Sequence, residues 1–439
     1  MFCWLRRVSC VLLVTSALAV ASDQLALRNV TVIDGTGTPP KAGLTVLITD
    51  GRISDVFATR SRKLSSSVKV LDLTGKYLIP GLIDSHYHLL AGMRSAETEE
   101  AFRRFAFLGG ITTVRSMADD AVALAELAKH ANESAVESPR IYFAALFGGP
   151  SLILKDRRIP QISHGRLPGE APWARAITAS TDITQAVADA KATGATGVKI
   201  YSDLTPDLIQ RITNEAHRQG LRVWAHAAVY PSRPRQVVAA GVDVVSHSML
   251  MVSQGMQTPP ETYLGSYILL DYGGVSYAAS EFSALLKDML ERGTMLDATL
   301  LVVESLRKST KGATLQDPEE MATWSYMMTQ RAHIRRIPIL AGTDLQETPR
   351  EREYPNLHAE LELLVREAGM TPIEALTAAT KNGAIGLGID SSYGTIEKGK
   401  VADLVVLSAD PSRDIRNSTS IVYIIKAGTV HRRERVKLP

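Results

Sequence analysis

Short apolar runs alternate with longer amphipathic segments between residues 80 and 390. The runs read GLIDSHYH, TTVRSM, RIYFAALFGG, GVKIY, LRVWAHA, VDVVSHS, TMLDATL and IPILAGTD. Eight strand candidates that alternate with helical patterns are typical of a parallel α/β fold, most simply a closed (β/α)8 TIM barrel. One intervening helix is well bounded, because Thr205 can cap it, Pro206 suits its first turn and Gly220 follows its last turn. The pattern predicts a barrel over residues 80–391.

The two flanks have a different pattern. Residues 24–79 and 393–437 are strand-and-turn segments with Gly and Asp at the turns. Neither flank is long enough to bury a sizeable core alone. We therefore predict one small β-sandwich domain that is assembled from both chain ends, residues 22–79 and 392–439.

The first 21 residues do not fit either domain. A basic leader, MFCWLRR, precedes the apolar stretch VSCVLLVTSALAVA, and the small residues Ala19, Val20 and Ala21 suit cleavage. This predicts a signal peptide over residues 1–21 and an exported, periplasmic or secreted protein, with a retained membrane anchor as the alternative. Both cysteines, Cys3 and Cys10, lie in this segment. The mature chain is then expected to have no disulfide, thiolate ligand, cysteine nucleophile or membrane anchor.

Composition and charge limit the classes of molecule that we expect this protein to bind. The formal net charge is +3, and the Lys and Arg residues are scattered among comparable numbers of Asp and Glu. Because no basic cluster is present, we expect no nucleic-acid partner. A small-molecule or dipeptide substrate is expected, and a homo-oligomer is compatible with the sequence.

Polar residues at the carboxyl ends of the barrel strands are the candidates for chemistry, because a barrel carries its active site there. His86 and His88 follow the first strand and lie two residues apart, so both side chains face the same side. The other candidates are Lys199 on the fourth strand, His226 after the fifth, His247 after the sixth and Asp344 after the eighth.

Each candidate alone has a structural explanation. A histidine at a strand end is often only hydrogen-bonded, Asp344 could cap a helix, and Lys199 could pack its stem on the barrel rim. Six metal-competent groups on the strand ends of one barrel are difficult to explain separately. Their conjunction predicts a metal centre.

At this point the sequence resembles a known family. The segments PGLIDSHYH, GVKIY, AHA, VSHS and AGTD, followed by NLHAELELLVREAGMTPIEALTAATKNGAIGLGI and GTIEKGKVADLVVL, are similar to the amidohydrolase superfamily of metal-dependent hydrolases. Within it, the chain resembles the branch that contains imidazolonepropionase-like proteins and carboxylated-lysine Xaa-Pro dipeptidases. The resemblance covers nearly all of the expected mature chain and implies a hydrolase of carbon–nitrogen bonds.

The resemblance also implies roles for the candidates. His86 and His88 match the pair that binds the more buried metal ion, and His226 and His247 match the pair that binds the second. Asp344 matches the aspartate that ligates the first ion and shuttles the proton. The reaction that the resemblance implies is the attack of a metal-bridging hydroxide on a peptide-like amide bond.

Lys199 matches a lysine that is carboxylated to N6-carboxylysine and bridges both ions in binuclear members, so its presence favours the dipeptidase-like branch. The chemistry of the residue agrees with this role. A dry pocket lowers the pKa of an amine from its usual value of about 10.4, and the neutral amine can take up carbon dioxide. The resulting anion would offset the repulsion between two divalent ions. Imidazole and carboxylate donors without thiolate suit Zn²⁺ best, while Mn²⁺ and Fe²⁺ also fit.

Residues for substrate recognition are less clearly indicated. Tyr201 points to the same side as Lys199 and could bind a substrate carboxylate or oxyanion, or simply pack at the rim. Arg115 in TTVRSM, and Arg350 and Arg352 after GTD, are carboxylate-binding candidates on expected mouth loops.

The long loop after the third strand, PSLILKDRRIPQISHGRLPGEAPWAR, carries Arg157, Arg158, His164 and Trp173. We expect it either to cover the mouth of the barrel or to pack on a neighbouring subunit. His164 is the candidate substrate-binding residue of this loop.

Several residues around the candidate ligands depart from the family pattern. Ser246 and Ser248 flank His247, Ser116 stands where an aspartate is common, and Leu345 follows Asp344 where a small residue is usual. These departures concern the substrate rather than the metal centre. The favoured function is a dipeptidase or N-acyl amino acid hydrolase; the alternatives are a hydrolase of a cyclic amide, lactone or phosphoester and, less consistent with six retained ligands, a non-catalytic binding protein.

Overall fold

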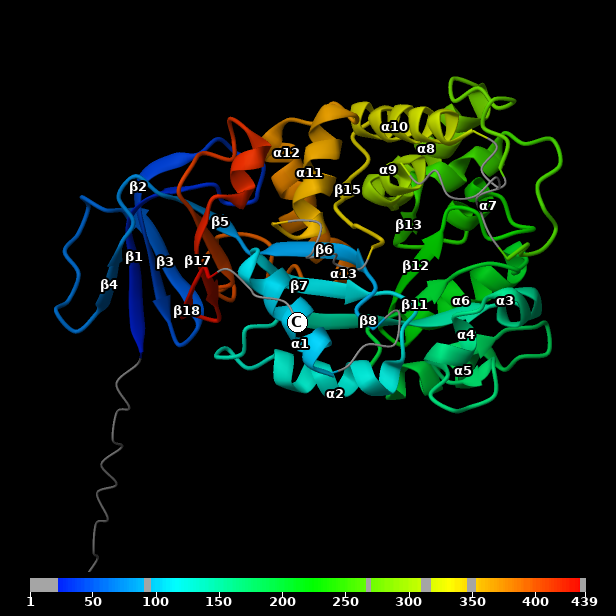
Figure 1. Ribbon diagram of the computed structural model, residues 1–439, viewed down its shortest axis with the longest axis horizontal. Coiled ribbons are helices and arrows are strands. Elements are labelled where there is room, and N and C mark those ends of the chain that lie inside the picture. The colour runs from blue at the N-terminus through cyan, green and yellow to red at the C-terminus, as the bar shows by residue number, and fades with distance from the viewer. Residues whose placement is uncertain (1–22, 91–95, 266–269, 309–316, 346–352, 435–439) are drawn as a thin grey trace, which may run out of the picture.

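The computed structural model describes residues 23–90, 96–265, 270–308, 317–345 and 353–434. A parallel α/β barrel forms the larger part of the molecule, and a small β domain lies at one end of it (Figure 1). The predicted export signal, Arg350 and Arg352 lie outside the described residues. None of the helices in these ranges combines the length and the apolar character that crossing a membrane requires.

The barrel strands are the eight apolar runs that the pattern predicts. In chain order they are β6 (Leu82–Tyr87), β7 (Ile111–Ser116), β8 (Arg140–Gly148), β11 (Gly197–Ile200), β12 (Arg222–His226), β13 (Val244–Ser246), β14 (Met295–Asp297) and β15 (Ile339–Leu340). Neighbouring strands pair in parallel from β6 to β15. Hydrogen bonds from Ser85 N to Ala341 O (2.9 Å) and from Asp344 N to His86 O (2.8 Å) join the last strand to the first. The predicted barrel fold is confirmed.

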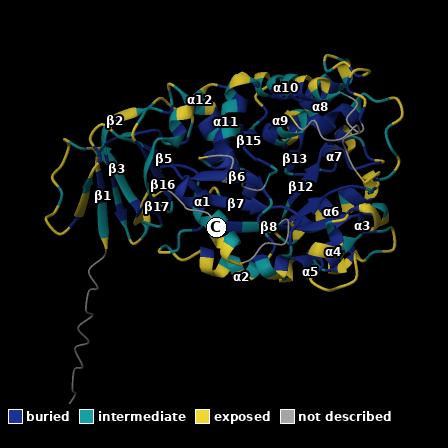
Figure 2. Cartoon of the chain, viewed as in Figure 1, coloured by how far each residue is buried: buried dark blue, intermediate teal, exposed yellow. Residues whose placement is uncertain are grey.

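Helices surround the strands, which explains why the strands are buried on both faces (Figure 2). The predicted helix at Pro206 is α6 (Pro206–Arg218), and Thr205 Oγ1 accepts from Leu208 N as its cap. The remaining helices are α1 (Ala96–Leu108), α2 (Ala121–Ala131), α3 (Pro150–Lys155), α4 (Ile159–Ile162), α5 (Ile183–Ala192), α7 (Pro234–Ala239), α8 (Ser280–Arg292), α9 (Leu300–Lys308), α10 (Pro318–Ile334), α11 (Asn356–Arg366), α12 (Pro372–Thr377) and α13 (Gly383–Leu387), with 3₁₀ turns η1 (Ser248–Gln254) and η3 (Ile415–Thr419) and the π-helical turn η2 (Ala378–Asn382). Two short strands, β9 (Glu170–Ala171) and β10 (Ala174–Ala176), lie in the long β8–β11 connection.

The small domain draws its strands from both ends of the described chain. They are β1 (Gln24–Val32), β2 (Lys41–Thr49), β3 (Arg52–Ala58), β4 (Lys69–Asp72), β5 (Tyr77–Pro80), β16 (Leu404–Leu407), β17 (Ile421–Lys426) and β18 (Thr429–Arg432). They form one mixed sheet that branches at β1, whose first half pairs with β4 and whose second half pairs with β5. Apolar side chains from both chain ends, including Val46, Leu78 and Val406, share one core.

Buried ionic contacts join the small domain to the barrel. Arg140, at the start of β8, makes a bidentate ion pair with Asp403 (2.8 and 3.3 Å), and Lys426 at the end of β17 donates to three main-chain carbonyls between residues 131 and 138. In Figure 1 the arrows of β6, β7 and β8 point away from the small domain. The carboxyl ends of the strands, where function is expected, are therefore at the opposite end of the barrel.

Candidate metal centre

All six predicted ligands line one cavity at the carboxyl ends of the strands. The cavity has a volume of about 90 Å³ and is lined by His86, His88, Ala118, Arg158, Lys199, Tyr201, His226, His247, Met249, Leu250 and Asp344. The six residues come from the ends of five strands, because β6 positions both His86 and His88. The barrel topology thus assembles groups that are up to 258 positions apart in the sequence (344 − 86).

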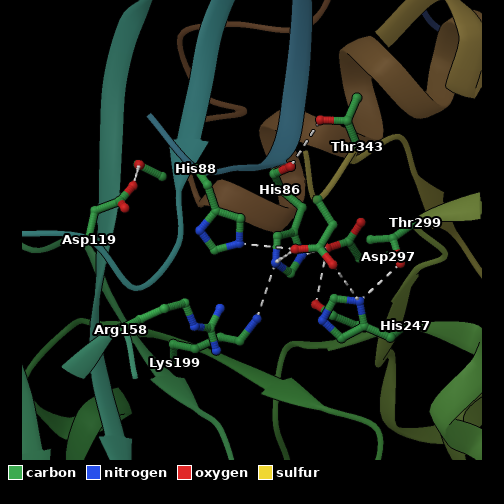
Figure 3. Close-up of polar contacts among 12 residues, drawn as sticks. His86, His88, Asp119, Arg158, Lys199, His247, Asp297, Thr299 and Thr343 are labelled. Carbon is green, nitrogen blue, oxygen red and sulfur yellow. Dashed lines mark hydrogen bonds and ion pairs between the residues drawn. The ribbon is translucent and has the colours of Figure 1, made fainter. Parts of the chain in front are cut away.

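His86 and His88 lie beside each other (Figure 3), and together with Asp344 they form one tight group. Asp344 Oδ1 lies 3.0 Å from His88 Nε2 and 3.3 Å from His86 Nε2. One donor atom from each residue lies within 4.8 Å of the others. Two imidazole nitrogens and a carboxylate oxygen at this spacing are a suitable donor set for a divalent transition metal ion.

His247 and His226 continue the cluster on its other side. His247 Nδ1 lies 3.6 Å from Asp344 Oδ2 and 3.0 Å from Thr299 Oγ1. The ring centroid of His247 is 4.8 Å from that of His86 and 4.5 Å from that of His226. His247 and Asp344 both have positive φ values, 71° and 53°, a conformation that is strained for residues other than glycine and that is often found at active sites.

Lys199 is buried at the centre of this group, with 1% of its surface exposed. Its Nζ atom lies 3.3 Å from His86 Nε2. Burial lowers the pKa of Lys199 to about 7, so the amine is neutral in a substantial fraction of molecules at neutral pH. This is the form that can react with an electrophile or bind a metal ion.

The other charges at the site follow from burial and hydrogen bonding. Burial lowers the pKa of His86 and His226 well below the usual value, and that of His247 to about 3, so these imidazoles are neutral. Burial alone would raise the pKa of Asp344, but the imidazoles of His86 and His247 and a hydrogen bond from His88 hold it well below its usual range. Neutral imidazoles and an ionised carboxylate are the states in which these side chains bind metal.

Two buried aspartates that support the cluster were missed in the sequence. Asp297, at the end of β14, makes a hydrogen-bond contact with His86 Nδ1, at 2.7 Å from Oδ2. Asp84, two residues before His86, accepts from His86 N (3.1 Å), Thr343 N (3.1 Å) and Thr343 Oγ1 (2.8 Å). A signal for Asp297 was present, because it is an acidic residue at the end of the seventh predicted strand.

The structure separates the three candidate substrate residues. Tyr201 lines the cavity, with its ring centroid 3.9 Å from that of His226, and Arg158 Nη2 donates to its hydroxyl at 2.5 Å. His164 does not line the cavity; its side chain is 54% exposed and pairs with Asp120 at 2.7 Å. The exposed position gives His164 no contact with the cavity.

The expectation for Arg115 requires correction. It was expected on a mouth loop, but it lies within strand β7, is fully buried and does not line the cavity. The run TTVRSM remains a β-strand as far as Ser116. The side chain of Arg115 therefore points into the barrel interior, below the mouth. Its carboxylate partner is Asp297, at 3.1 Å from Nη2.

The departure at Ser116 is compensated by a nearby acid. Ser116 Oγ donates to Asp119, which is also buried, and accepts from Leu89 N at 3.1 Å. These contacts hold the chain that leaves β6 just after His88 (Figure 3). Asp119 thus supplies a carboxylate close to the position where Ser116 lacks one.

Comparisons with known proteins agree with this geometry. The family described as "Amidohydrolase family" matches residues 77–432. An imidazolonepropionase from Chromobacterium violaceum is 24% identical over 422 residues, which cover 91% of this chain and 93% of the relative. Among solved structures, a Xaa-Pro dipeptidase with bound methionine has 20% identity and a TM-score of 0.71, covering 93% of this chain and 100% of the other. An ochratoxinase from A. niger has 21% identity and a TM-score of 0.73, covering 93% and 95%.

The two solved structures share the fold, and the family match spans the whole barrel and half of the strands of the small domain. The chain belongs to the amidohydrolase family, and it is a hydrolase that acts on carbon–nitrogen bonds.

Proposed function

We propose that this amidohydrolase is a binuclear metal-dependent enzyme that hydrolyses the amide bond of a dipeptide or an N-acyl amino acid. The observation that carries the proposal is the convergence of four histidines, an aspartate and a buried lysine on one cavity. The donor set has imidazole and carboxylate groups and no thiolate, which favours Zn²⁺. His86, His88 and Asp344 would hold one ion, and His226 and His247 the other.

Lys199 is proposed to bridge the two positions as N6-carboxylysine. In that reaction the neutral Nζ forms a bond to the carbon of CO₂ while one C=O double bond opens to a single bond, and the nitrogen releases one proton, so the neutral amine becomes an anion. The proposal is supported by the burial of Lys199 and by the lowering of its pKa to about 7. Divalent ions held here would polarise the scissile carbonyl and lower the pKa of a water molecule.

Asp344 is proposed to move the proton in this reaction. Its carboxylate is ionised and borders the cavity, so it can accept a proton from the attacking water and return it to the leaving nitrogen. The hydrogen bond with His88 and the contact with His86 fix the orientation of this carboxylate. The proton-transfer groups are therefore held rigidly before substrate binds.

Arg158 and Tyr201 support a substrate that carries a carboxylate. Both line the cavity, and the short hydrogen bond between them presents a guanidinium and a phenol together. Burial raises the pKa of Tyr201, so the phenol keeps its proton and can donate it in a hydrogen bond. A carboxylate of the substrate would find a neutral donor on this wall, beside a guanidinium that is also paired with Asp156.

Asp344→Asn tests the chemical assignment. We expect kcat to fall by about 10²- to 10⁴-fold, the usual contribution of general acid–base catalysis, while most of the metal stays bound. Turnover and metal content of the purified protein are measured together. Asp207→Asn, on the exposed surface of α6, is the matched control and should behave like wild type. Near-wild-type turnover in Asp344→Asn would refute the assignment of the base.

Matched substrates test the substrate class. Metal-loaded protein is offered dipeptides and N-acyl amino acids, each beside its C-terminal amide, with cyclic amides, lactones and phosphoesters as the alternative class. We expect the free acids to be preferred and Arg158→Gln to lose most of this preference. If no member of the first class releases an amino acid, the peptidase proposal is wrong and the alternative class takes its place. Export of the protein, proposed from residues 1–21, is tested separately by fractionation.

A further inference from the structure

Arg115 is a fully buried cation that the proposed reaction does not use. It lies in β7 with no exposed surface, and its guanidinium carbon is 4.7 Å from the centroid of the Trp224 ring. Nη2 donates to Asp297 Oδ2 at 3.1 Å. Arg115 does not line the cavity, so it cannot touch a substrate held there.

The oxygen atom that Arg115 contacts belongs to β14 and is also contacted by side chains from two other strands. Asp297 Oδ2, on β14, also lies 2.7 Å from His86 Nδ1 of β6 and accepts from Ser246 Oγ of β13 (3.0 Å). An oxygen that receives hydrogen bonds from a guanidinium and a hydroxyl acts as an acceptor. The third contact must then be a donation as well, which requires the proton of the neutral His86 ring to be on Nδ1.

This tautomer decides what His86 offers to the cavity. With the proton on Nδ1, the lone pair is on Nε2, and Nε2 is the atom that faces Asp344 Oδ1 and Lys199 Nζ, at 3.3 Å each. A carboxylate that receives the second N–H of a metal-binding histidine fixes both its tautomer and its ring orientation. A buried carboxylate, in turn, is costly without a cation to balance it.

We propose that Arg115 is a positioning residue that acts through Asp297 to hold His86 in the Nε2 metal-binding tautomer and orientation. The inference rests on the proposed metal-dependent function. A purely structural role is the alternative, and the chain contains a suitable comparison. Arg140 and Asp403 form another buried Arg–Asp pair, but this pair lies at the joint between the domains, beyond the opposite end of the barrel.

The test compares Arg115→Met with Arg140→Met, and each variant removes the charge of one buried pair. The probe is Co²⁺ alone, whose affinity is measured by competition with a chelator and whose visible absorption spectrum reports the ligand geometry. Unfolding midpoints are measured in parallel. We expect Arg115→Met to weaken Co²⁺ binding about 10- to 100-fold and to change the spectrum, and Arg115→Lys to restore part of the affinity. Arg140→Met should lower the midpoint and leave affinity and spectrum unchanged.

Wild-type affinity and spectrum in Arg115→Met, or equal weakening in Arg140→Met, would overturn the inference while leaving the metal-dependent function intact. If wild type itself binds no Co²⁺, the proposed function fails first. Asp297→Asn is the second variant if Arg115→Met does not fold. It keeps the volume of the side chain and removes the acceptor charge, so the inference requires the same weakening and spectral change, and their absence contradicts it.

Discussion

Two buried lysines of the described chain, one in each domain, differ in the hydrogen-bond acceptors that surround them. Lys199 and Lys426 are 1% and 0% exposed, and burial lowers their pKa values to about 7 and about 8. Lys426 Nζ donates to the carbonyls of Ala131 (2.6 Å), Val136 (3.0 Å) and Ser138 (2.9 Å). These three acceptors use all the hydrogen atoms of an ammonium group.

Lys199 has no such set of acceptors. Among the described residues, its hydrogen-bond contact is His86 Nε2 at 3.3 Å, and Asp344 and the other imidazoles surround it. The three carbonyl partners of Lys426 are sufficient to explain it as a structural cation. Lys199, among the groups that we propose as metal ligands, is explained by the proposed carboxylation, which changes its charge. The difference teaches that the partners of a buried charge, rather than its burial, separate a structural role from a catalytic one.

The largest expected effect is that of Lys199→Met on turnover. Loss of the bridging group should remove several kcal/mol of transition-state stabilisation, or about 10³-fold in kcat/KM. Stability should stay the same or rise, because Met fills the volume of a buried amine that has few partners. The measurements are kcat/KM, metal ions per chain and the free energy of unfolding. An active Lys199→Met enzyme with two ions per chain would remove the contrast between the lysines.

Lys426→Met should have the opposite signature. Removing the ammonium leaves three carbonyls in the domain joint without their donor, so we expect a loss of about 3 kcal/mol or more in the free energy of unfolding. The kcat of the folded fraction should stay near wild type, because the joint lies far from the cavity. Denaturant unfolding and active-site titration check the two parts. Wild-type stability in this variant would show that the carbonyls find other partners.

The sequence alone could not separate these two lysines. Both lie in β-branched runs, GVKIY and IVYIIKAG, so local pattern gives them the same description. The acceptors of Lys426 lie 288 to 295 positions earlier in the chain, and only the packing of the two domains brings them together. The strand-end position of Lys199, by contrast, is a local property, and parallel topology alone predicts that strand ends converge.

The same distinction explains which site predictions were accurate in position. The eight strands and the convergence of His86, His88, Lys199, His226, His247 and Asp344 follow from local pattern and barrel topology. The positions of Arg115 below the mouth and of His164 outside the cavity could not be predicted, because the direction of a side chain depends on tertiary packing. The strand-end position of Asp297 is a local property that the sequence shows, but its contact with His86 Nδ1 depends on tertiary packing.

The contrast extends to histidine, with a smaller effect. His358 is buried between Gly109 O and Ser418 Oγ, both at 2.8 Å, and burial lowers its pKa to about 4. The unfolded chain binds this proton near pH 6.5 and the native chain does not, so the stabilisation is complete above pH 6.5 and declines as the pH falls toward 4. We compare the free energy of unfolding of wild type with that of His358→Gln. We expect the difference between them to shift by about 2 kcal/mol against wild type when the pH is lowered from 7.5 to 5. Urea unfolding of both proteins at the two pH values measures this; a constant difference would contradict it.

The smallest effect is expected for His164→Ala. The side chain of His164 is 54% exposed and outside the cavity, and its contact with Asp120 lies at the surface. Exposed ion pairs contribute little, and substitutions away from buried features usually change stability by less than about 0.5 kcal/mol. We expect kcat/KM within about twofold of wild type across the substrate panel, because the loop contacts the cavity through Arg158 instead. A selective rise in KM would show that this loop moves His164 to the substrate on binding, and that a residue's partners in the free protein do not always reveal its role.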